Sequence, residues 1–351
     1  MKKKELGVLA LIGFAVAGAL SFGQQGDGEV HILPVRGNIY MLVGAGGNIT
    51  VSAGQDGVLL VDSGLAQMSD KVLAAIRQIQ KEVATNGVAN LHWGAEGRSS
   101  LRAIMDTDAP PKAIRYIINT HVHPDHVGGN EKIGRAGQTY TGGNVAGNIS
   151  DAGEGAAIIA HENVLNRLSE MKPPVPFGML PTDTYHTDSM NLSHFFNGDG
   201  VQIIYQPAAH TDGDSMVYFR GSDVLSAGDI FTPERYPIID LARGGSIQGE
   251  INALNHMLDV AIPEFRLEGG TMVIPGHGRL CDAADVAYYR DMVTIIRDRI
   301  QTMIKKDMTL EQVKAAKPTL DYDGIYGATT GIWTTDMFIE AVYKSLLNQK
   351  K

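Results

Sequence analysis

The sequence predicts an α+β protein whose two β-sheets pack face to face with helices on the outside, an αββα sandwich. Short strand-like runs occur in blocks separated by helical segments, and this pattern suits two packed sheets covered by helices. The chain of 351 residues, with 44% hydrophobic and 20% charged residues, has the composition of an ordinary globular protein. The clusters of histidine and aspartate follow strand-like runs, so we expect one site at one edge of the two packed sheets.

The first 23 residues have the pattern of a cleaved export signal. Three lysines precede the apolar run Leu6–Leu20, and small residues then offer cleavage positions (Ala19, Ser21 and Gly23). A membrane anchor is the alternative, but the run is short for a bilayer, and no cysteine follows it to carry a lipid. We therefore predict a periplasmic or secreted protein, with residues 24–351 as the folded domain and no membrane span after cleavage.

Charge and cysteine content narrow the class of protein further. The formal net charge is −9, from 30 basic and 39 acidic residues, and no run rich in lysine or arginine occurs in the folded part. This argues against a nucleic-acid groove and favours a small-molecule substrate, whereas the oligomeric state is left open. Cys281 is the only cysteine, so no disulfide can form within one chain. We interpret it as a packed small hydrophobe, the alternative being an approach to the site expected at the edge of the sheets.

Between residues 30 and 61, apolar runs alternate with turn residues, which predicts an antiparallel meander of four strands. The strands are His31–Val35, Ile39–Val43, Asn48–Ser52 and Val58–Val61. Ala66–Ile79 follows as an amphipathic helix, because its apolar residues recur at helical spacing. Residues 81–112 are long and polar for a link between a helix and a strand, and we interpret them as an insertion.

A run of histidine and aspartate follows the apolar strand Ile114–Ile118. In extended backbone, residues two apart point the same way, so His121 and His123 can bind one metal ion. A proline then ends the strand, and Asp125 with His126 can turn toward a second position. Nitrogen and oxygen donors suit zinc or another first-row metal. A solvent-facing polar loop is the alternative, but three histidines and an aspartate at one strand end, among eleven histidines in all, favour a metal site.

Residues 139–198 are predicted to be a second insertion. Their first part, Thr139–Gly155, is rich in glycine and asparagine and forms either a lid or rim of the site or a poorly ordered excursion. A strand at Ala157–His161 and a helix to Lys172 follow, and several prolines then enforce irregular backbone. His186 and His194 lie in or just after this stretch.

The second half of the chain also contains strands that are followed by histidine and aspartate residues. Predicted strands are Val201–Tyr205, Met216–Phe219, Val224–Ala227 and Thr271–Ile274, and His210, Asp229 and His277 follow the first, third and fourth of them. Predicted helices are Glu250–Ala261, Asp285–Lys305, Leu310–Ala316 and Thr335–Asn348, so that residues 285–351 form a helical extension. The segment between residues 230 and 249 is located to line a pocket, although surface salt bridges explain its arginines equally well (Arg235, Tyr236, Arg243 and Ser246).

The order of these motifs resembles the metallo-β-lactamase superfamily. The run His121-Val122-His123-Pro124-Asp125-His126 is similar to its signature, and the other landmarks follow the family order from Asp62-Ser63-Gly64 onward. The resemblance covers about residues 30–280 and implies the αββα fold. It also implies a ligand set in which His121, His123 and His210 hold the first metal, Asp125, His126 and His277 hold the second, and Asp229 bridges them. Asp62 would support the loop of residues 121–126, called the metal loop below, from outside the ligand set.

The resemblance implies a secreted hydrolase with two zinc ions per chain, iron or manganese being alternatives. A metal-bridged hydroxide would attack the substrate, and Asp125 would serve as catalytic residue by orienting it. Asp229 is similar to the aspartate of the glyoxalase II, lactonase, phosphodiesterase and alkyl-sulfatase branches. The two most familiar lactamase subclasses differ at this position. The implied substrate is therefore a small ester, thioester, lactone or β-lactam.

Three alternative functions stay open at this point: a β-lactamase proper, an iron-dependent oxidoreductase and a non-catalytic accessory protein on the same scaffold. The complete set of seven ligands argues against a mononuclear persulfide dioxygenase. His123 argues against a flavo-diiron protein, which would carry glutamate at that position. A full ligand set also makes the accessory protein the weakest of the three.

Overall fold

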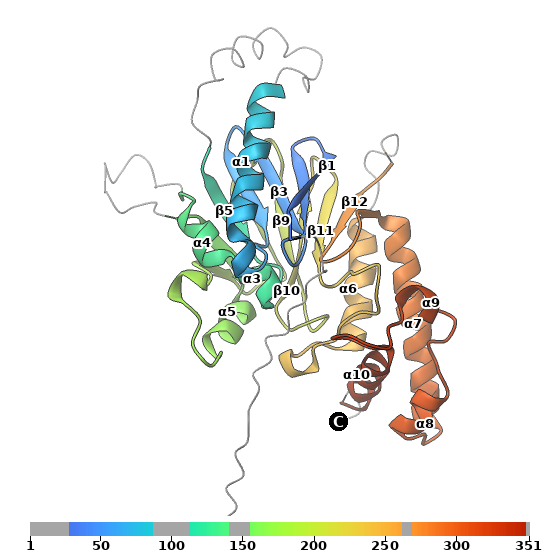
Figure 1. The fold of residues 1–351 in the computed structure, drawn as a ribbon. Coiled ribbons are helices and arrows are strands. Elements are labelled where there is room, and N and C mark those ends of the chain that lie inside the picture. The colour runs from blue at the N-terminus through green and yellow to red at the C-terminus, as the bar shows by residue number, and fades with distance from the viewer. Residues whose placement is uncertain (1–27, 87–111, 140–154, 262–268, 349–351) are drawn as a thin grey trace, which may run out of the picture.

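The structure, a computed structural model, describes residues 28–86, 112–139, 155–261 and 269–348. The predicted export signal, most of the predicted 81–112 insertion and most of the glycine-rich loop lie outside these residues. Within them, two β-sheets pack against each other and helices cover both outer faces (Figure 1). The predicted αββα sandwich is confirmed.

The first sheet contains seven strands in chain order. The first four pair antiparallel, as the meander predicted, and β4 to β7 then pair parallel. The strands are β1 (His31–Arg36), β2 (Ile39–Val43), β3 (Ile49–Gly54), β4 (Gly57–Val61), β5 (Ile114–Ile118), β6 (Ala157–His161) and β7 (Asp183–Tyr185).

The second sheet has six strands in the order β13-β12-β11-β10-β9-β8. Its strands are β8 (Ser189–Asn191), β9 (Val201–Gln206), β10 (Asp214–Phe219), β11 (Val224–Gly228), β12 (Met272–Pro275) and β13 (Cys281–Asp282). Within the segment predicted to be an insertion, 139–198, the described residues supply the predicted strand β6 and also β7 and β8, which form an edge of each sheet. Strands of three residues are too short for an alternating pattern to reveal them.

Helices cover the first sheet on one side and the second sheet on the other (Figure 1). Near the first sheet lie the 3₁₀ turn η1 (Ala66–Met68), α1 (Ser69–Asn86), α3 (Pro124–Val127), α4 (Asn130–Arg135), α5 (Glu162–Ser169) and the turn η2 (Phe177–Met179). Near the second lie the turn η3 (Leu241–Arg243), α6 (Ile247–Val260), α7 (Ala283–Lys305), α8 (Leu310–Ala315), α9 (Asp323–Tyr326) and α10 (Thr335–Asn348). Because α1 continues to Asn86, residues 81–86 are helical and do not belong to an insertion.

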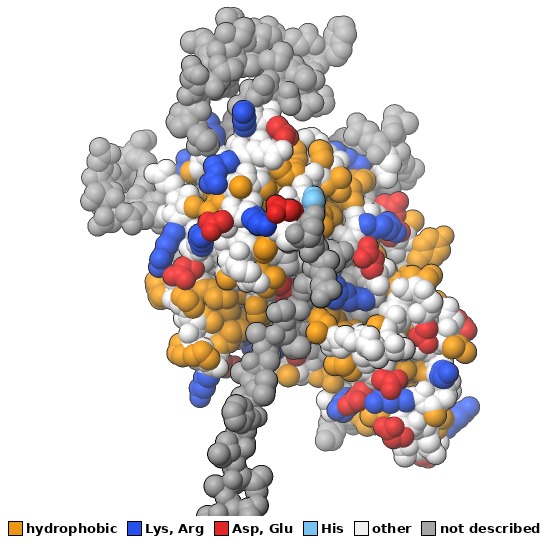
Figure 2. Space-filling model, viewed as in Figure 1, with side chains coloured by type: hydrophobic (Ala, Val, Ile, Leu, Met, Phe, Trp, Pro, Cys, Tyr) orange, Lys and Arg blue, Asp and Glu red, His pale blue; other side chains and the backbone are white. Residues whose placement is uncertain are grey.

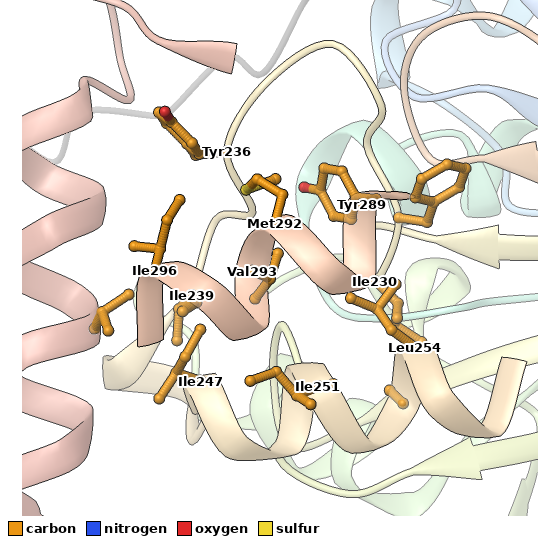
Figure 3. Packing of buried hydrophobic residues seen from close by; sticks show 14 of the residues in the cluster. Ile230, Tyr236, Ile239, Ile247, Ile251, Leu254, Tyr289, Met292, Val293 and Ile296 are labelled. Atoms are coloured by element: carbon orange, nitrogen blue, oxygen red, sulfur yellow. The ribbon is translucent and has the colours of Figure 1, made fainter. Parts of the chain in front are cut away.

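Three buried clusters hold these layers together. One lies between the sheets and includes Leu59 and Val217, and a second lies between the first sheet and α1. The third joins the second sheet to α6, α7 and α10, where residues such as Leu254 and Val293 interdigitate (Figure 3). Cys281 packs in this third cluster, and burial raises its pKa to about 12. The structure therefore agrees with its interpretation as a packed small hydrophobe.

The topology brings several strand ends to one edge of the sandwich. β4 and β5 run parallel, so Asp62 and the metal loop leave the first sheet at the same edge. β11 and β12 also run parallel, so Asp229 and His277 leave the second sheet together. Asn48 connects the two sheets there, because its backbone N–H donates to Gly276 O at 2.7 Å.

Candidate metal centre

At this edge the structure gathers all seven residues that the sequence predicts as ligands, and all seven are buried. They form two groups, within each of which the candidate donor atoms lie no more than 4.8 Å apart. The first group is His121, His123, His210 and Asp229, and the second is Asp125, His126 and His277. Their role as metal ligands stays a prediction, but their convergence is a property of the fold.

Asp229 lies between the two groups. Its Oδ1 is 3.2 Å from His126 Nε2 and 3.5 Å from His277 Nε2, while its Oδ2 is 3.8 Å from His210 Nε2. Burial opposes ionisation of this carboxyl, yet the surrounding histidines, led by His277, hold its pKa well below the usual range. An ionised carboxylate in this place can contact two cations at once.

Four of the histidines use one ring nitrogen for a partner outside the centre. The pairs are His121 Nδ1 with Thr120 Oγ1 (3.0 Å), His123 Nε2 with Asp240 Oδ2 (3.0 Å), His126 Nδ1 with Asp62 Oδ2 (2.7 Å) and His210 Nδ1 with Ile238 O (2.5 Å). When the outer nitrogen carries the proton, the inner nitrogen keeps its lone pair for the centre. The surroundings therefore select the tautomer that a metal ligand needs.

Several inward-facing polar atoms lack any hydrogen-bond partner among the described residues. They are His121 Nε2, both carboxylate oxygens of Asp125, His126 Nε2, Asp229 Oδ1 and both ring nitrogens of His277. Buried polar groups without partners cost free energy, and cations bound between them would remove this cost. Burial, reinforced by the neighbouring His126 and His210, lowers the pKa of His121 well below its ordinary value, so its imidazole is neutral. The donor set thus fits zinc or another first-row metal.

Asp62 holds the metal loop from behind. It adopts a positive φ of 67°, its Oδ1 accepts the Thr120 backbone N–H at 2.8 Å, and its Oδ2 accepts both the Thr120 hydroxyl and His126 Nδ1. Ser63 also contacts the metal loop. Its hydroxyl is 3.0 Å from His126 O and 2.8 Å from Asn130 Oδ1. These contacts are those that the resemblance implied for Asp62.

Asp240 is a site residue that sequence reasoning missed. It caps η3, and its Oδ2 lies within hydrogen-bond distance of both His123 Nε2 and Arg243 Nη1. Partial burial opposes ionisation, but the hydrogen bonds from His123 and Arg243 hold the pKa of Asp240 below its ordinary value. The arginines between residues 230 and 249 were predicted either to line a pocket or to form salt bridges. Arg243 forms an ion pair, with its Nη1 2.6 Å from Asp240 Oδ2. No spacing rule links Asp240 to a histidine more than a hundred residues earlier.

Comparison with known proteins identifies the family. Residues 42–277 match the sequence profile of the metallo-beta-lactamase superfamily. The chain belongs to the metallo-β-lactamase superfamily. A search of curated protein sequences gives no match.

Solved structures of other superfamily members share the fold at low sequence identity. A metallo-beta-lactamase from Pontibacter korlensis is 14% identical with a TM-score of 0.51, covering 76% of this chain and 99% of its own. The sec-alkylsulfatase Pisa1 from Pseudomonas sp. is 16% identical with a TM-score of 0.57, and the match covers 90% of this chain. This chain spans about half the length of that alkylsulfatase, since the match covers 50% of it.

In this superfamily member, α6 packs tightly against the loop that carries His210. A Cβ added to Gly249 would lie 1.8 Å from Ala208 O, a distance that no side chain tolerates. We expect Gly249→Ala to lower the free energy of unfolding by about 1–3 kcal/mol, because helix and loop must separate. Urea denaturation checks this result.

Gly324→Ala is the matched control for Gly249→Ala. Gly324 also lies in a helix, but an added Cβ there would meet no atom within 4 Å, so the change should stay within about 0.5 kcal/mol. Equal stability of the two variants would show that the close approach of α6 to the loop is not needed.

Proposed function

We propose that the protein is an exported binuclear metallohydrolase that cleaves a small ester, thioester, lactone or β-lactam. The observation that carries this proposal is the convergence of two buried groups of donor atoms on one shared carboxylate, Asp229. A single structural metal would need only one such group. Export to the periplasm or beyond the cell is proposed from the pattern of residues 1–23.

Bound zinc ions would lower the pKa of a water molecule and polarise the electrophilic centre of the substrate. The chain's own contribution is to hold the donors in place and to accept or orient a proton. Asp125 suits the second task, because both its oxygens are buried, and Oδ2 is 3.1 Å from His277 Nε2. A hydrogen bond from the water to this carboxylate would fix the direction of attack.

The surface supports a small-molecule substrate. Charged side chains of both signs are interspersed on the face drawn in Figure 2, without a basic stripe among the residues described there. In the described part of the chain, no helix is both long enough and apolar enough to cross a bilayer. The mixed charge distribution favours a small molecule over a nucleic acid.

A second candidate substrate class is a sulfate ester. A structural match that covers 90% of this chain is a sec-alkylsulfatase, and the nucleophile proposed here can also attack a sulfuryl centre. The similarity shows the fold alone, so the substrate class is a matter for experiment.

The test is elemental analysis of the purified protein, paired with a hydrolysis screen of nitrocefin, lactones, thioesters, phosphodiesters and a secondary alkyl sulfate. Two zinc ions per chain with turnover of one class would support the proposal and name the substrate. One iron per chain without hydrolysis would favour an oxidoreductase. No metal under replete conditions would overturn the metal site and favour an accessory protein.

A further inference from the structure

One segment, residues 236–246, surrounds the backbone of His210, and we refer to it as the strap. The backbone N–H of Asp240 donates to His210 O at 2.9 Å, and the N–H of Ser246 donates to Ala209 O at 2.9 Å. Ile238 O faces His210 Nδ1. Through Asp240 Oδ2 the strap also contacts His123 Nε2, so it touches two of the three histidines in the first donor group.

The helical extension of residues 285–351, called the C-terminal extension below, holds the N-terminal end of the strap. The ring of Tyr236, which is 1% exposed, stacks on Phe338 of α10 with centroids 4.6 Å apart and an interplanar angle of 5°. The Tyr236 hydroxyl lies 2.9 Å from Asp323 Oδ1 and 3.2 Å from Thr319 O, both in the extension. The Tyr236 backbone N–H donates to Tyr326 O at 3.3 Å.

The C-terminal extension also holds the C-terminal end of the strap. The backbone N–H of Ile247, the residue after the strap, donates to the hydroxyl of Ser345 on α10 at 3.0 Å. Between the two ends, Ile239 of the strap packs in the buried cluster with Val293 and Ile296 of α7 (Figure 3). The strap is therefore fastened at both ends by α9, α10 and the residues before α9.

We propose that the C-terminal extension positions the first metal's histidines by fastening the strap, with Tyr236 and Ser345 as positioning residues. This inference rests on the proposed metal-dependent function. If the ends of the strap loosen, Ile238 O and Asp240 Oδ2 no longer hold the rings of His210 and His123 in one orientation. Outer contacts of this kind change metal affinity by about 10–100-fold.

The test compares Tyr236→Phe, alone and with Ser345→Ala, with the matched control Tyr343→Phe. Tyr236→Phe keeps the aromatic stack and removes only the hydroxyl. Tyr343 also lies in the extension and donates a hydrogen bond, but to Met308 O at 3.1 Å, which belongs to the extension itself. The single variants Tyr236→Phe and Tyr343→Phe each remove one tyrosine hydroxyl and should lose similar stability, so stability alone cannot explain a difference in metal binding between them.

Metal-free full-length proteins are titrated with zinc against a chelating indicator, and cobalt(II) absorption reports ligand geometry. We expect the double variant to bind one of its two zinc ions roughly tenfold or more weakly and to change the cobalt spectrum, while Tyr343→Phe matches the wild type. Wild-type affinity and spectrum in the double variant would overturn the inference and leave the proposed function intact. A wild-type protein that binds no metal would overturn both.

Discussion

Replacing Asp229 with alanine should remove one metal equivalent and lower hydrolysis by at least about a hundredfold, since cation chemistry of this kind supplies several kcal/mol. The carboxylate of Asp229 approaches His126 and His277 on one side and His210 on the other. Asp125, the other carboxylate among the seven donors, lies 3.8 Å from His126 Nε2 and 3.1 Å from His277 Nε2, both in its own group. Elemental analysis and turnover, measured on the same preparation, check this result.

Asp199→Asn is the matched control for Asp229→Ala. Asp199 is also buried, but it accepts the backbone N–H groups of Gly221 and Ser222 at the opposite end of β10. Its replacement should reduce stability and leave the metal content unchanged. Full activity with two metals in Asp229→Ala would contradict the binuclear assignment.

Replacing Asp62 with alanine should weaken binding of the second metal by about 10–100-fold. It should also lower the free energy of unfolding by about 2–4 kcal/mol. The change leaves the Thr120 N–H, the Thr120 hydroxyl and His126 Nδ1 without their shared acceptor in a buried site. Zinc titration and urea denaturation of the metal-free protein measure the two effects separately.

The variant Asp62→Asn distinguishes the effect of the contact with the Thr120 backbone N–H from the effect of the contact with His126 Nδ1. Asparagine tolerates the positive φ of this position, and its side-chain oxygen can still accept the Thr120 N–H. Its amide nitrogen cannot accept from His126 Nδ1, so metal affinity should fall while most of the stability is retained. Unchanged zinc affinity in both Asp62 variants would show that the His126 ring is held by other contacts.

The convergence of the side chains in residues 121–126 could be predicted from the sequence, because the information for it is local. His121, His123, Asp125 and His126 follow one strand, and their spacing alone indicated two metal positions. His210, Asp229 and His277 are separated along the chain, and they entered the predicted set through the family resemblance.

What could not be predicted depends on long-range contacts that leave no pattern in the chain. Asp240 supports His123, and a backbone carbonyl at Ile238, which any residue would supply, supports His210. The edge strands β7 and β8 have three residues each, which is too short for a period-two signal. The residues that hold the ligands were therefore harder to predict than the ligands themselves.

The seven donors are shared between the two halves of the sandwich. His121, His123, Asp125 and His126 come from the first sheet, and His210, Asp229 and His277 come from the second. At the edge between the sheets, several polar atoms have no hydrogen-bond partner among the described residues, and Asn48 crosses this edge with its hydrogen bonds. Cations bound there would act as cross-links between the two layers, in addition to apolar packing and hydrogen bonds such as Thr50 Oγ1 to Ser226 Oγ at 3.0 Å. The thermal stability of this protein would then depend on the supply of metal in its compartment, and a chelator would act on it as a denaturant does.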